Sequence, residues 1–134
     1  MKRLIYTSIA APDTTYETLR AILDVSVQAN LLHSITGMLI YDGAHFMQCI
    51  EGPQKAIDQL MVNIQSDQRH SNIHIVGTEM TDTRLFPHWN MGYLNHEPPI
   101  REMLKRYTGN DTFQPERLDM QKATSMLQEL SLII

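Results

Sequence analysis

The hydrophobic pattern of the first 95 residues constrains the fold most, because it switches between the two-residue period of a strand and the 3.6-residue period of a helix in a fixed order. Residues 3–9, RLIYTSI, are rich in β-branched and aromatic side chains and predict a strand. Thr14 and Glu17 have the spacing of a capping box, so a helix is expected from there to about residue 30. Its buried stripe follows the i, i+3, i+4 rule at Leu19, Ile22 and Leu23.

A hairpin and a second helix follow. Residues 36–52, TGMLIYDGAHFMQCIEG, predict two strands that turn at Asp42 and Gly43. Pro53 suits the first position of a helix, because proline fixes φ at a helical value and lacks only an N–H that would have no partner there. The apolar face of this helix consists of Ile57, Leu60, Met61 and Ile64.

Two further strands complete the pattern. Residues 66–70 are expected to form a loop, residues 72–80 alternate as a strand does, and residues 89–94 leave room for a fifth strand. The order is then β-α-β-β-α-β-β, which is the α+β, ferredoxin-like arrangement with one added strand. Both helices should cover one face of a mixed sheet, with right-handed crossovers.

The rest of the chain predicts a helical extension. A short helix is expected over residues 98–107, a loop over 108–114, and a last helix from Pro115. We expect these two helices to cap the other face of the sheet, which divides the chain into a core of residues 1–96 and an extension of residues 97–134. The apolar positions of the last helix are Leu118, Ala123, Met126, Leu127 and Leu130.

Composition narrows the function classes. The net charge of −4 offers no broad basic surface for nucleic acid. The single cysteine, Cys49, excludes an intramolecular disulfide and a cysteine-based zinc site, and no stretch approaches the about 20 apolar residues of a membrane span. We therefore expect a cytoplasmic protein that binds neither membrane nor metal. Because no nucleophile–base pair stands out, we expect no enzyme activity.

Polar side chains interrupt the predicted core. Gln48 lies between Phe46 and Ile50 on one strand face, and the stripe of the first helix continues through Ser26 and Asn30. A buried amide without partners costs about 1–3 kcal/mol for each unsatisfied group. These positions therefore require hydrogen-bond partners in the fold.

Each of these residues also has an ordinary structural interpretation. A single buried glutamine is usually satisfied by backbone, a strand tyrosine such as Tyr6 usually packs with its hydroxyl at the rim, and an asparagine near a helix end is usually a C-cap. Alternation does not decide which face Tyr6 occupies, because Ile5 and Ile9 make the opposite face apolar too. Taken together, Tyr6, Asn30 and Gln48 predict a polar pocket that needs a ligand or water. Glu51, on the opposite strand face from Gln48, is expected to be exposed to solvent.

Five segments together resemble the BLUF domain, a flavin-based blue-light sensor. They are LIYTS, QANLLHSITGMLIY, FMQCIEG, DQRH and RLFPHWNMGY, and their order and spacing cover about residues 1–95. The resemblance implies a ferredoxin-like fold, in agreement with the order of elements above. It also implies a non-covalently bound flavin, usually FAD, with FMN or riboflavin as alternatives, between the two helices.

The resemblance assigns roles to the polar residues. Tyr6 would donate an electron and then a proton to the excited flavin, and Gln48 would lie between Tyr6 and the N5 and C4-carbonyl groups of the ring. Asn30 would hold the C4-carbonyl and N3 edge. Asp67 and Arg69 would reach the other polar edge of the ring.

Further positions complete the implied site. Ser26 and Ile64 would contact the cofactor, and Trp89 and Met91, on the fifth strand, would relay the signal. Ala29 departs from the family pattern, in which Asn or His often precedes the conserved asparagine. Cys49 faces away from Gln48, so a flavin–cysteinyl adduct is not expected.

The implied function is a photoreceptor that signals by contact to an unknown downstream protein in a light-dependent way, and that forms a homo-oligomer. The apolar last helix and the ending ELSLII indicate a surface for a partner or for self-association. The alternative is a non-photoactive small-ligand or RNA-binding module on the same fold.

Overall fold

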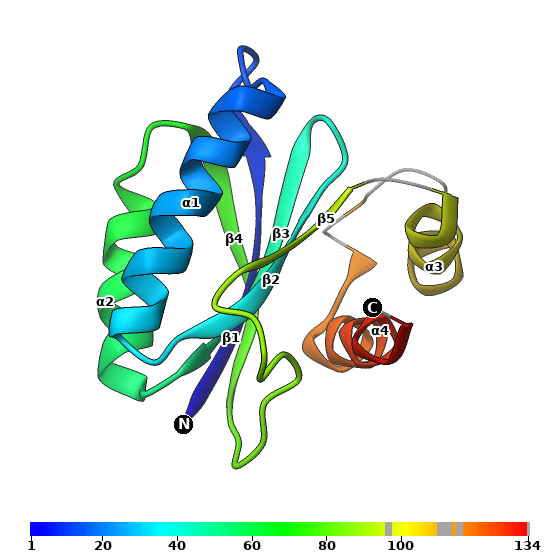
Figure 1. The fold of residues 1–134 in the computed structure, drawn as a ribbon. Helices are drawn as coiled ribbons and strands as arrows, with labels where there is room; N and C mark the ends of the chain where they lie inside the picture. The colour runs from blue at the N-terminus through cyan, green and yellow to red at the C-terminus, as the bar shows by residue number, and fades with distance from the viewer. Residues whose placement is uncertain (96–97, 110–113, 115–116, 134) are drawn as a thin grey trace.

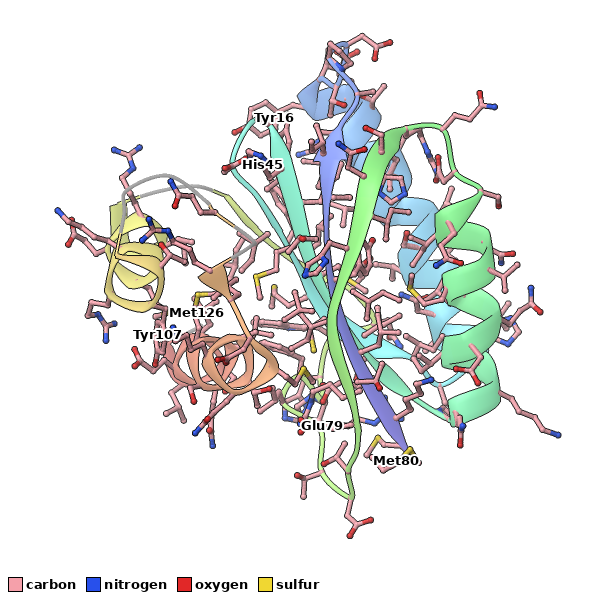
Figure 2. The ribbon with its side chains drawn as sticks, turned by 180° about the vertical axis from the view of Figure 1, so that it is seen from behind. Tyr16, His45, Glu79, Met80, Tyr107 and Met126 are labelled. Carbon is pink, nitrogen blue, oxygen red and sulfur yellow. The ribbon has the colours of Figure 1, made fainter. Side chains whose placement is uncertain are left out.

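The computed structural model describes residues 1–95, 98–109, 114 and 117–133. Two layers of helices enclose a sheet: α1 and α2 cover one side, and α3 and α4 lie on the other (Figure 1). Figure 2 shows the same arrangement from behind, with Tyr107 and Met126 on the α3–α4 side. The elements follow in the order β1 (Lys2–Ala10), α1 (Tyr16–Leu32), β2 (Thr36–Tyr41), β3 (His45–Gly52), α2 (Gln54–Gln65), β4 (His70–Met80), β5 (Gly92–Asn95), α3 (Pro98–Thr108) and α4 (Met120–Ile133).

The sheet has the order β4-β1-β3-β2-β5. β1 pairs antiparallel with β3 and with β4, β2 pairs antiparallel with β3, and β5 is parallel to β2. This mixed five-stranded sheet confirms the predicted α+β, ferredoxin-like class with an added strand. β1 and β3 are neighbours near the middle, which places Tyr6 directly opposite Gln48.

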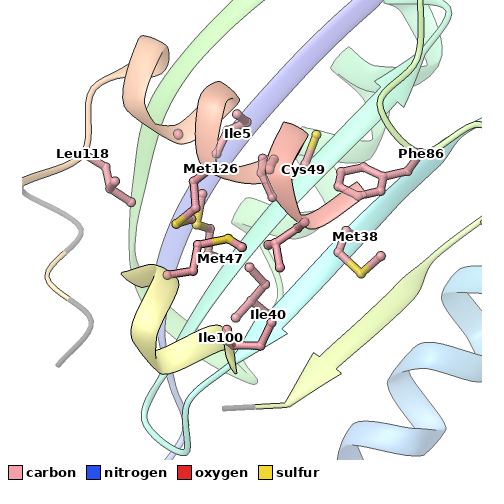
Figure 3. Close-up of a cluster of buried hydrophobic side chains, with 13 residues drawn as sticks. Ile5, Met38, Ile40, Met47, Cys49, Phe86, Ile100, Leu118 and Met126 are labelled. Atoms are coloured by element: carbon pink, nitrogen blue, oxygen red, sulfur yellow. The ribbon is translucent and has the colours of Figure 1, made fainter. Parts of the chain in front are cut away.

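Two apolar clusters fill the spaces on the two faces of the sheet. Leu4 and Tyr6 belong to the cluster under α1 and α2, whereas Ile5 belongs to the cluster under α3 and α4. Figure 3 shows the second cluster, in which strand residues meet Phe86 and residues of the C-terminal helices. The predicted apolar positions of the last helix are all buried there, at Leu118, Ala123, Met126, Leu127 and Leu130.

The start of α1 lies one residue from the predicted one. Thr15, not Thr14, is the N-cap, and it forms the capping box with Thr18 through bonds of 3.2 Å (Thr18 N to Thr15 Oγ1) and 2.7 Å (Thr15 N to Thr18 Oγ1). The hydroxyl of Thr14 donates instead to the carbonyl of Ala11, at 2.7 Å. That bond orients the Thr14 hydroxyl toward the turn after β1, and the helix is capped one residue later.

The fifth strand is shorter than predicted, so Trp89 and Met91 precede β5 instead of lying on it. The carbonyl of Trp89 accepts from Gly37 N at 3.0 Å, and the Asn90 side chain donates to Ile35 O at 3.0 Å. These bonds hold residues 89–91 as an irregular segment beside the start of β2, and the regular ladder with β2 starts only at Gly92.

Other boundaries differ slightly. α2 begins at Gln54 with Pro53 as its N-cap, and β4 begins at His70. α4 begins at Met120, where the side chain of Asp119 accepts from Lys122 N at 2.8 Å. Pro115, the predicted start of this helix, and the predicted division between residues 96 and 97 lie outside the described residues.

Among the described helices, we find no segment with the length and apolar character that crossing a membrane requires.

Candidate functional site

A cavity of about 240 Å³ lies between α1 and α2 above the sheet. This volume is far larger than the about 30 Å³ that one water occupies, so the cavity is large enough for an organic ligand. Of the residues predicted from the sequence to form the site, all except Trp89 line it: Tyr6, Ser26, Asn30, Gln48, Ile64, Asp67, Arg69 and Met91. The fold therefore brings together residues from β1, α1, β3, α2 and the segments that follow α2 and precede β5.

Tyr6 and Gln48 form a buried pair in this cavity. The Tyr6 hydroxyl donates to Gln48 Oε1, and both side chains are almost fully buried. Burial, with a smaller contribution from the charge of Asp67, raises the pKa of the Tyr6 phenol well above its usual value. Tyr6 therefore stays protonated at neutral pH and acts as the donor of this bond.

The other end of the Gln48 amide faces Met91. Gln48 Nε2 donates to the Met91 sulfur at 3.2 Å, and a thioether is a weak acceptor. An amide nitrogen has two N–H groups, so Gln48 keeps a donor for a ligand. Because this contact is made by the amide nitrogen, a rotation of the Gln48 amide would change the contact with Met91.

Asn30 lies near the end of α1 with its side chain almost fully buried. It is not the C-cap: His33 holds that position. The Asn30 Nδ2 group donates to the carbonyl of Asn90 at 2.8 Å, which leaves its second N–H and its Oδ1 for a ligand. Asn30 and Gln48 thus contact consecutive residues, Asn90 and Met91.

A charged pair stands at the mouth of the cavity. Arg69 donates to both carboxylate oxygens of Asp67, with Nε at 2.9 and 3.0 Å and a terminal nitrogen at 2.5 Å. The hydrogen bonds from Arg69 lower the pKa of Asp67, so the carboxylate stays charged. Arg69 is the only arginine or lysine among the described residues that line the cavity.

His70 lines the same cavity and was not predicted as part of the site. Its Nε2 lies 2.9 Å from the carbonyl of Ile64, which can only accept, so Nε2 carries the proton and Nδ1 accepts from the Ser8 hydroxyl at 2.8 Å. The ring meets Tyr6 edge-on, with 6.2 Å between centroids. The sequence signal was its place directly after Arg69 in DQRH, but a single histidine is usually a surface residue.

Most other missed residues are apolar or small. They form the walls of the cavity on α1, β2, β3 and α2, where amphipathic periodicity alone does not separate a cavity wall from a closed core: Ile22, Leu23, Val25, Ala29, Leu39, Phe46 and Leu60. Asn63, on α2, also lines the cavity and is bonded to Gln59 at 3.3 Å.

Trp89 lies outside this cavity. Its side chain is 38% exposed and lines a separate surface hollow together with Val27 and Tyr93. Met91, not Trp89, contacts Gln48.

The donor set fits a flavin ring. Apolar walls suit the flat faces of an aromatic ring, while the amides of Asn30 and Gln48 supply both donors and acceptors for a ring edge that alternates carbonyl and nitrogen groups. Among the described residues, no group of three or more His, Cys, Asp or Glu side chains is placed to hold a metal ion.

Comparison with known proteins agrees with this fit. A sequence model of the BLUF family, described as sensors of blue-light using FAD, matches residues 1–92. The photoactivated adenylate cyclase subunit beta of Euglena gracilis is 30% identical over 122 residues, which are 84% of this chain and 14% of that protein. The blue light- and temperature-regulated antirepressor BluF of Escherichia coli K12 is 31% identical over 70 residues, which are 52% of this chain and 17% of that protein. The chain thus spans a small fraction of these curated relatives.

Solved structures are similar over nearly the whole chain. The photo-activated state of BlsA has a TM-score of 0.89 and 34% identity, covering 98% of this chain and 94% of that one. The dark state of the BLUF protein BlrB has a TM-score of 0.80 and 29% identity, covering 99% and 96%. A bacterial light-regulated adenylyl cyclase has a TM-score of 0.67 and 32% identity, covering 99% of this chain but 34% of that one. The likeness to BlsA and BlrB therefore extends beyond the sheet to the C-terminal helices.

Proposed function

The chain belongs to the BLUF family of blue-light sensors that use FAD, and we propose that Tyr6 and Gln48 are its light-reactive pair. The observation that carries this proposal is the hydrogen bond from the Tyr6 hydroxyl to Gln48 Oε1 inside a cavity with the chemistry of a flavin site. The family match also favours this function over a non-photoactive small-ligand or RNA-binding module on the same fold.

A bound flavin supplies the absorption of blue light and, once excited, accepts an electron. Tyr6 is placed to give that electron and then its hydroxyl proton. Loss of the proton removes the donor that holds Gln48 Oε1 in its present position, so the amide can rotate or tautomerise. When the electron and the proton return to Tyr6, Gln48 remains in its new arrangement until the dark state is restored.

The changed amide has two consequences. It would alter the hydrogen bond that Gln48 offers to a carbonyl of the bound ring, and such a change would shift the absorption to the red without a covalent bond. It also changes the contact between Gln48 and Met91, because the Nε2 group that donates to the Met91 sulfur in the present arrangement would be moved. We propose that this second change carries the signal to residues 89–91 and then to the C-terminal helices.

The remaining polar residues would bind the cofactor. Asn30 holds a ring edge through the N–H and Oδ1 that its bond to Asn90 leaves over. Asp67 and Arg69, at the mouth of the cavity, would bind the polar edge of the ring, and Ser26 and Ile64 would contact it from the two helices. FAD is the expected cofactor, and the site as described would also accept FMN or riboflavin, because its polar groups face a ring.

We propose that these residues sense light and that the response is carried out by another protein, reached by contact. The end-to-end likeness to BlsA and BlrB supports this, whereas the cyclases are several times longer. Self-association also remains our proposal. The last helix exposes less apolar surface for self-association than its sequence indicated. Leu127 and Leu130 are buried against the sheet, while Leu132 is exposed.

Absorption spectroscopy tests the function. The purified protein with FAD should be yellow, and blue light should shift its spectrum to the red, with reversal in the dark. A protein that takes up none of FAD, FMN and riboflavin, or that binds flavin without a reversible shift, would contradict the proposal.

A further inference from the structure

Glu51 is a fully buried carboxylate on the face of the sheet opposite the cavity. The expectation that it is exposed was wrong. Its oxygens accept from three donor groups: Arg3 Nε at 2.9 Å, Leu85 N at 2.9 and 3.0 Å, and Phe86 N at 3.0 Å. The end of β3 therefore binds the backbone of the connection between β4 and β5, which is distant in the sequence.

Arg3 compensates the charge of this carboxylate. It also pairs with the carboxylate of Glu79 and donates to the carbonyl of Thr83 at 3.0 Å. Burial alone would lower the pKa of Arg3, but the hydrogen bonds to Glu79 and Glu51 outweigh it and raise the pKa. Figure 2 shows Glu79 close to the end of β4, where the connection to β5 starts.

Arg84, which belongs to this connection, binds the end of β3 and the start of β2. Its guanidinium donates to the backbone carbonyl of Glu51 at 3.1 Å, to Thr36 Oγ1 at 2.8 Å and to Ser34 O at 2.8 Å. Residues 83–86 are thus fixed to β1, to the end of β3 and to the start of β2. We call residues 83–86 the anchored segment.

The anchored segment contacts the cluster under α3 and α4 through Leu85 and Phe86. Phe86 is buried in the cluster under α3 and α4 (Figure 3). Pro87 and His88 separate this segment from residues 89–91, and Met91 contacts Gln48 in the cavity. One short connection therefore touches the C-terminal helices at one end and the light-reactive pair at the other.

A buried ion pair is a poor source of stability, because desolvation cancels much of its attraction. Positioning of the backbone explains the buried Glu51 better, since its carboxylate fixes where the N–H groups of Leu85 and Phe86 lie. The chain between Phe86 and Met91 is held at one end by the bond from Phe86 N to Glu51 and at the other by the bond from Gly37 N to Trp89 O. A displacement of Met91 can therefore be passed to Phe86.

We propose that Glu51 is a positioning residue for the light response: its carboxylate fixes the anchored segment, so that a change at Met91 is passed to Phe86 and the C-terminal helices. This inference rests on the proposed function of Tyr6 and Gln48. Glu51 itself does not touch the cofactor site.

The substitution Glu51→Gln in the flavin-loaded protein tests the proposal. It removes the charge, and at either oxygen position the amide N–H₂ would face donors: Arg3 Nε and Leu85 N at Oε2, or Leu85 N and Phe86 N at Oε1. Glu79→Gln is the matched control, because Glu79 also binds Arg3 but makes no bond to those two amides, and its side chain is 37% exposed.

Measurements in the dark test the anchor without any photochemistry. The chain has one tryptophan, Trp89, so its emission reports on this connection alone. In E51Q we expect red-shifted, more easily quenched Trp89 emission and amide exchange at Leu85 and Phe86 about tenfold faster or more. The control E79Q should match the parent in both.

Measurements in the light test the coupling. E51Q should still form the red-shifted flavin state, because Tyr6 and Gln48 are unchanged. The light-dependent difference in amide exchange across α3 and α4 should fall about threefold or more, and the same reduction is not expected in E79Q. If E51Q does not fold, Arg84→Lys is used instead, since lysine cannot reproduce the forked bonds of Arg84.

The outcomes are distinguishable. A parent protein without a red shift counts against the proposed function. If E51Q has the parent's amide exchange and Trp89 emission in the dark, the proposed role of Glu51 is overturned while the proposed function stands. The same holds if the light-dependent difference in amide exchange across α3 and α4 is undiminished in E51Q. Loss of folding in both E51Q and R84K would also overturn it, because the role would then be structural.

Discussion

Tyr6 and Gln48 lie directly opposite each other on the neighbouring strands β1 and β3, and the tyrosine hydroxyl donates to the amide oxygen of the glutamine. The antiparallel register sets this pairing, so no loop has to close for the two groups to meet. The amide nitrogen of the same glutamine reaches Met91, outside both strands. One side chain thus joins Tyr6, the donor that we propose, to the segment that we propose carries the signal.

Tyr6→Phe should keep the flavin bound and abolish the red-shifted state. Phenylalanine fills the same space but has neither the hydroxyl proton nor the readily oxidised phenol. Difference absorption spectra before and after blue light measure this. Tyr41→Phe is the control, because the Tyr41 hydroxyl donates to Gly43 O at the hairpin turn and does not line the cavity. A normal photocycle in Y6F would remove Tyr6 from its proposed role.

Gln48→Leu should abolish the ordinary red shift while the protein stays folded. Leucine removes the groups that bond to Tyr6 and Met91, and it leaves the Tyr6 hydroxyl without its acceptor at a cost of about 1–3 kcal/mol. Flavin spectra and urea unfolding measure the two effects. Gln59→Leu, on the exposed face of α2, should leave both unchanged. A Q48L protein that cycles like the parent would contradict our account of the glutamine.

Asn30→Ala should weaken flavin binding by about tenfold or more, because it removes an amide that faces the ring and also bonds to Asn90 O. Titration of the flavin-free protein with riboflavin measures the affinity. Gln65→Ala is the control, because Gln65 is an exposed amide on α2 that does not line the cavity. Equal losses in the two variants would show that Asn30 has no special role.

The pKa of Tyr6 predicts an alkaline limit to stability. Burial raises this pKa above its usual value of 10.0, so above that pH the unfolded phenol ionises while the folded one stays neutral. Stability from Tyr6 is therefore complete below pH 10.0 and is lost as the pH rises, by up to about 1.4 kcal/mol for each pH unit. Urea unfolding from about pH 9 to about pH 11 should show a steeper loss for the parent than for Y6F. Parallel curves would contradict the buried, neutral phenol.

Gly37→Ala should destabilise the fold by about 3 kcal/mol. A Cβ at Gly37 would lie 2.0 Å from the carbonyl oxygen of Cys49, so β2 and β3 would have to separate. Urea unfolding measures the change. Gly43→Asn is the control, because Gly43 has φ +95° and open space around it, and asparagine tolerates positive φ better than other side chains. A G37A protein as stable as the parent would show that this strand pair yields easily.

Much of the fold could be predicted because its signals are local. Periodicity identified the helix faces that carry Leu19 and Ile57, and the order of elements predicted the sheet. The capping residue was missed by one position, because Thr14 and Thr15 are equally good caps until the turn after β1 is formed. The sequence predicted Met91 on the fifth strand. The bond from Gly37 N to Trp89 O, which holds residues 89–91 outside the regular ladder, joins residues too distant in the chain to be seen in the sequence.

The sequence by itself determined the elements, their apolar stripes and the polar residues that interrupt them, because side-chain period and backbone preference act over a few neighbouring residues. Only the tertiary structure decided which face Tyr6 occupies, that Met91 and not Trp89 meets Gln48, and that Glu51 is buried. The physical reason is that a polar group is buried only where partners satisfy it. The partners of Glu51, at Arg3, Leu85 and Phe86, come from distant parts of the chain that folding alone brings together.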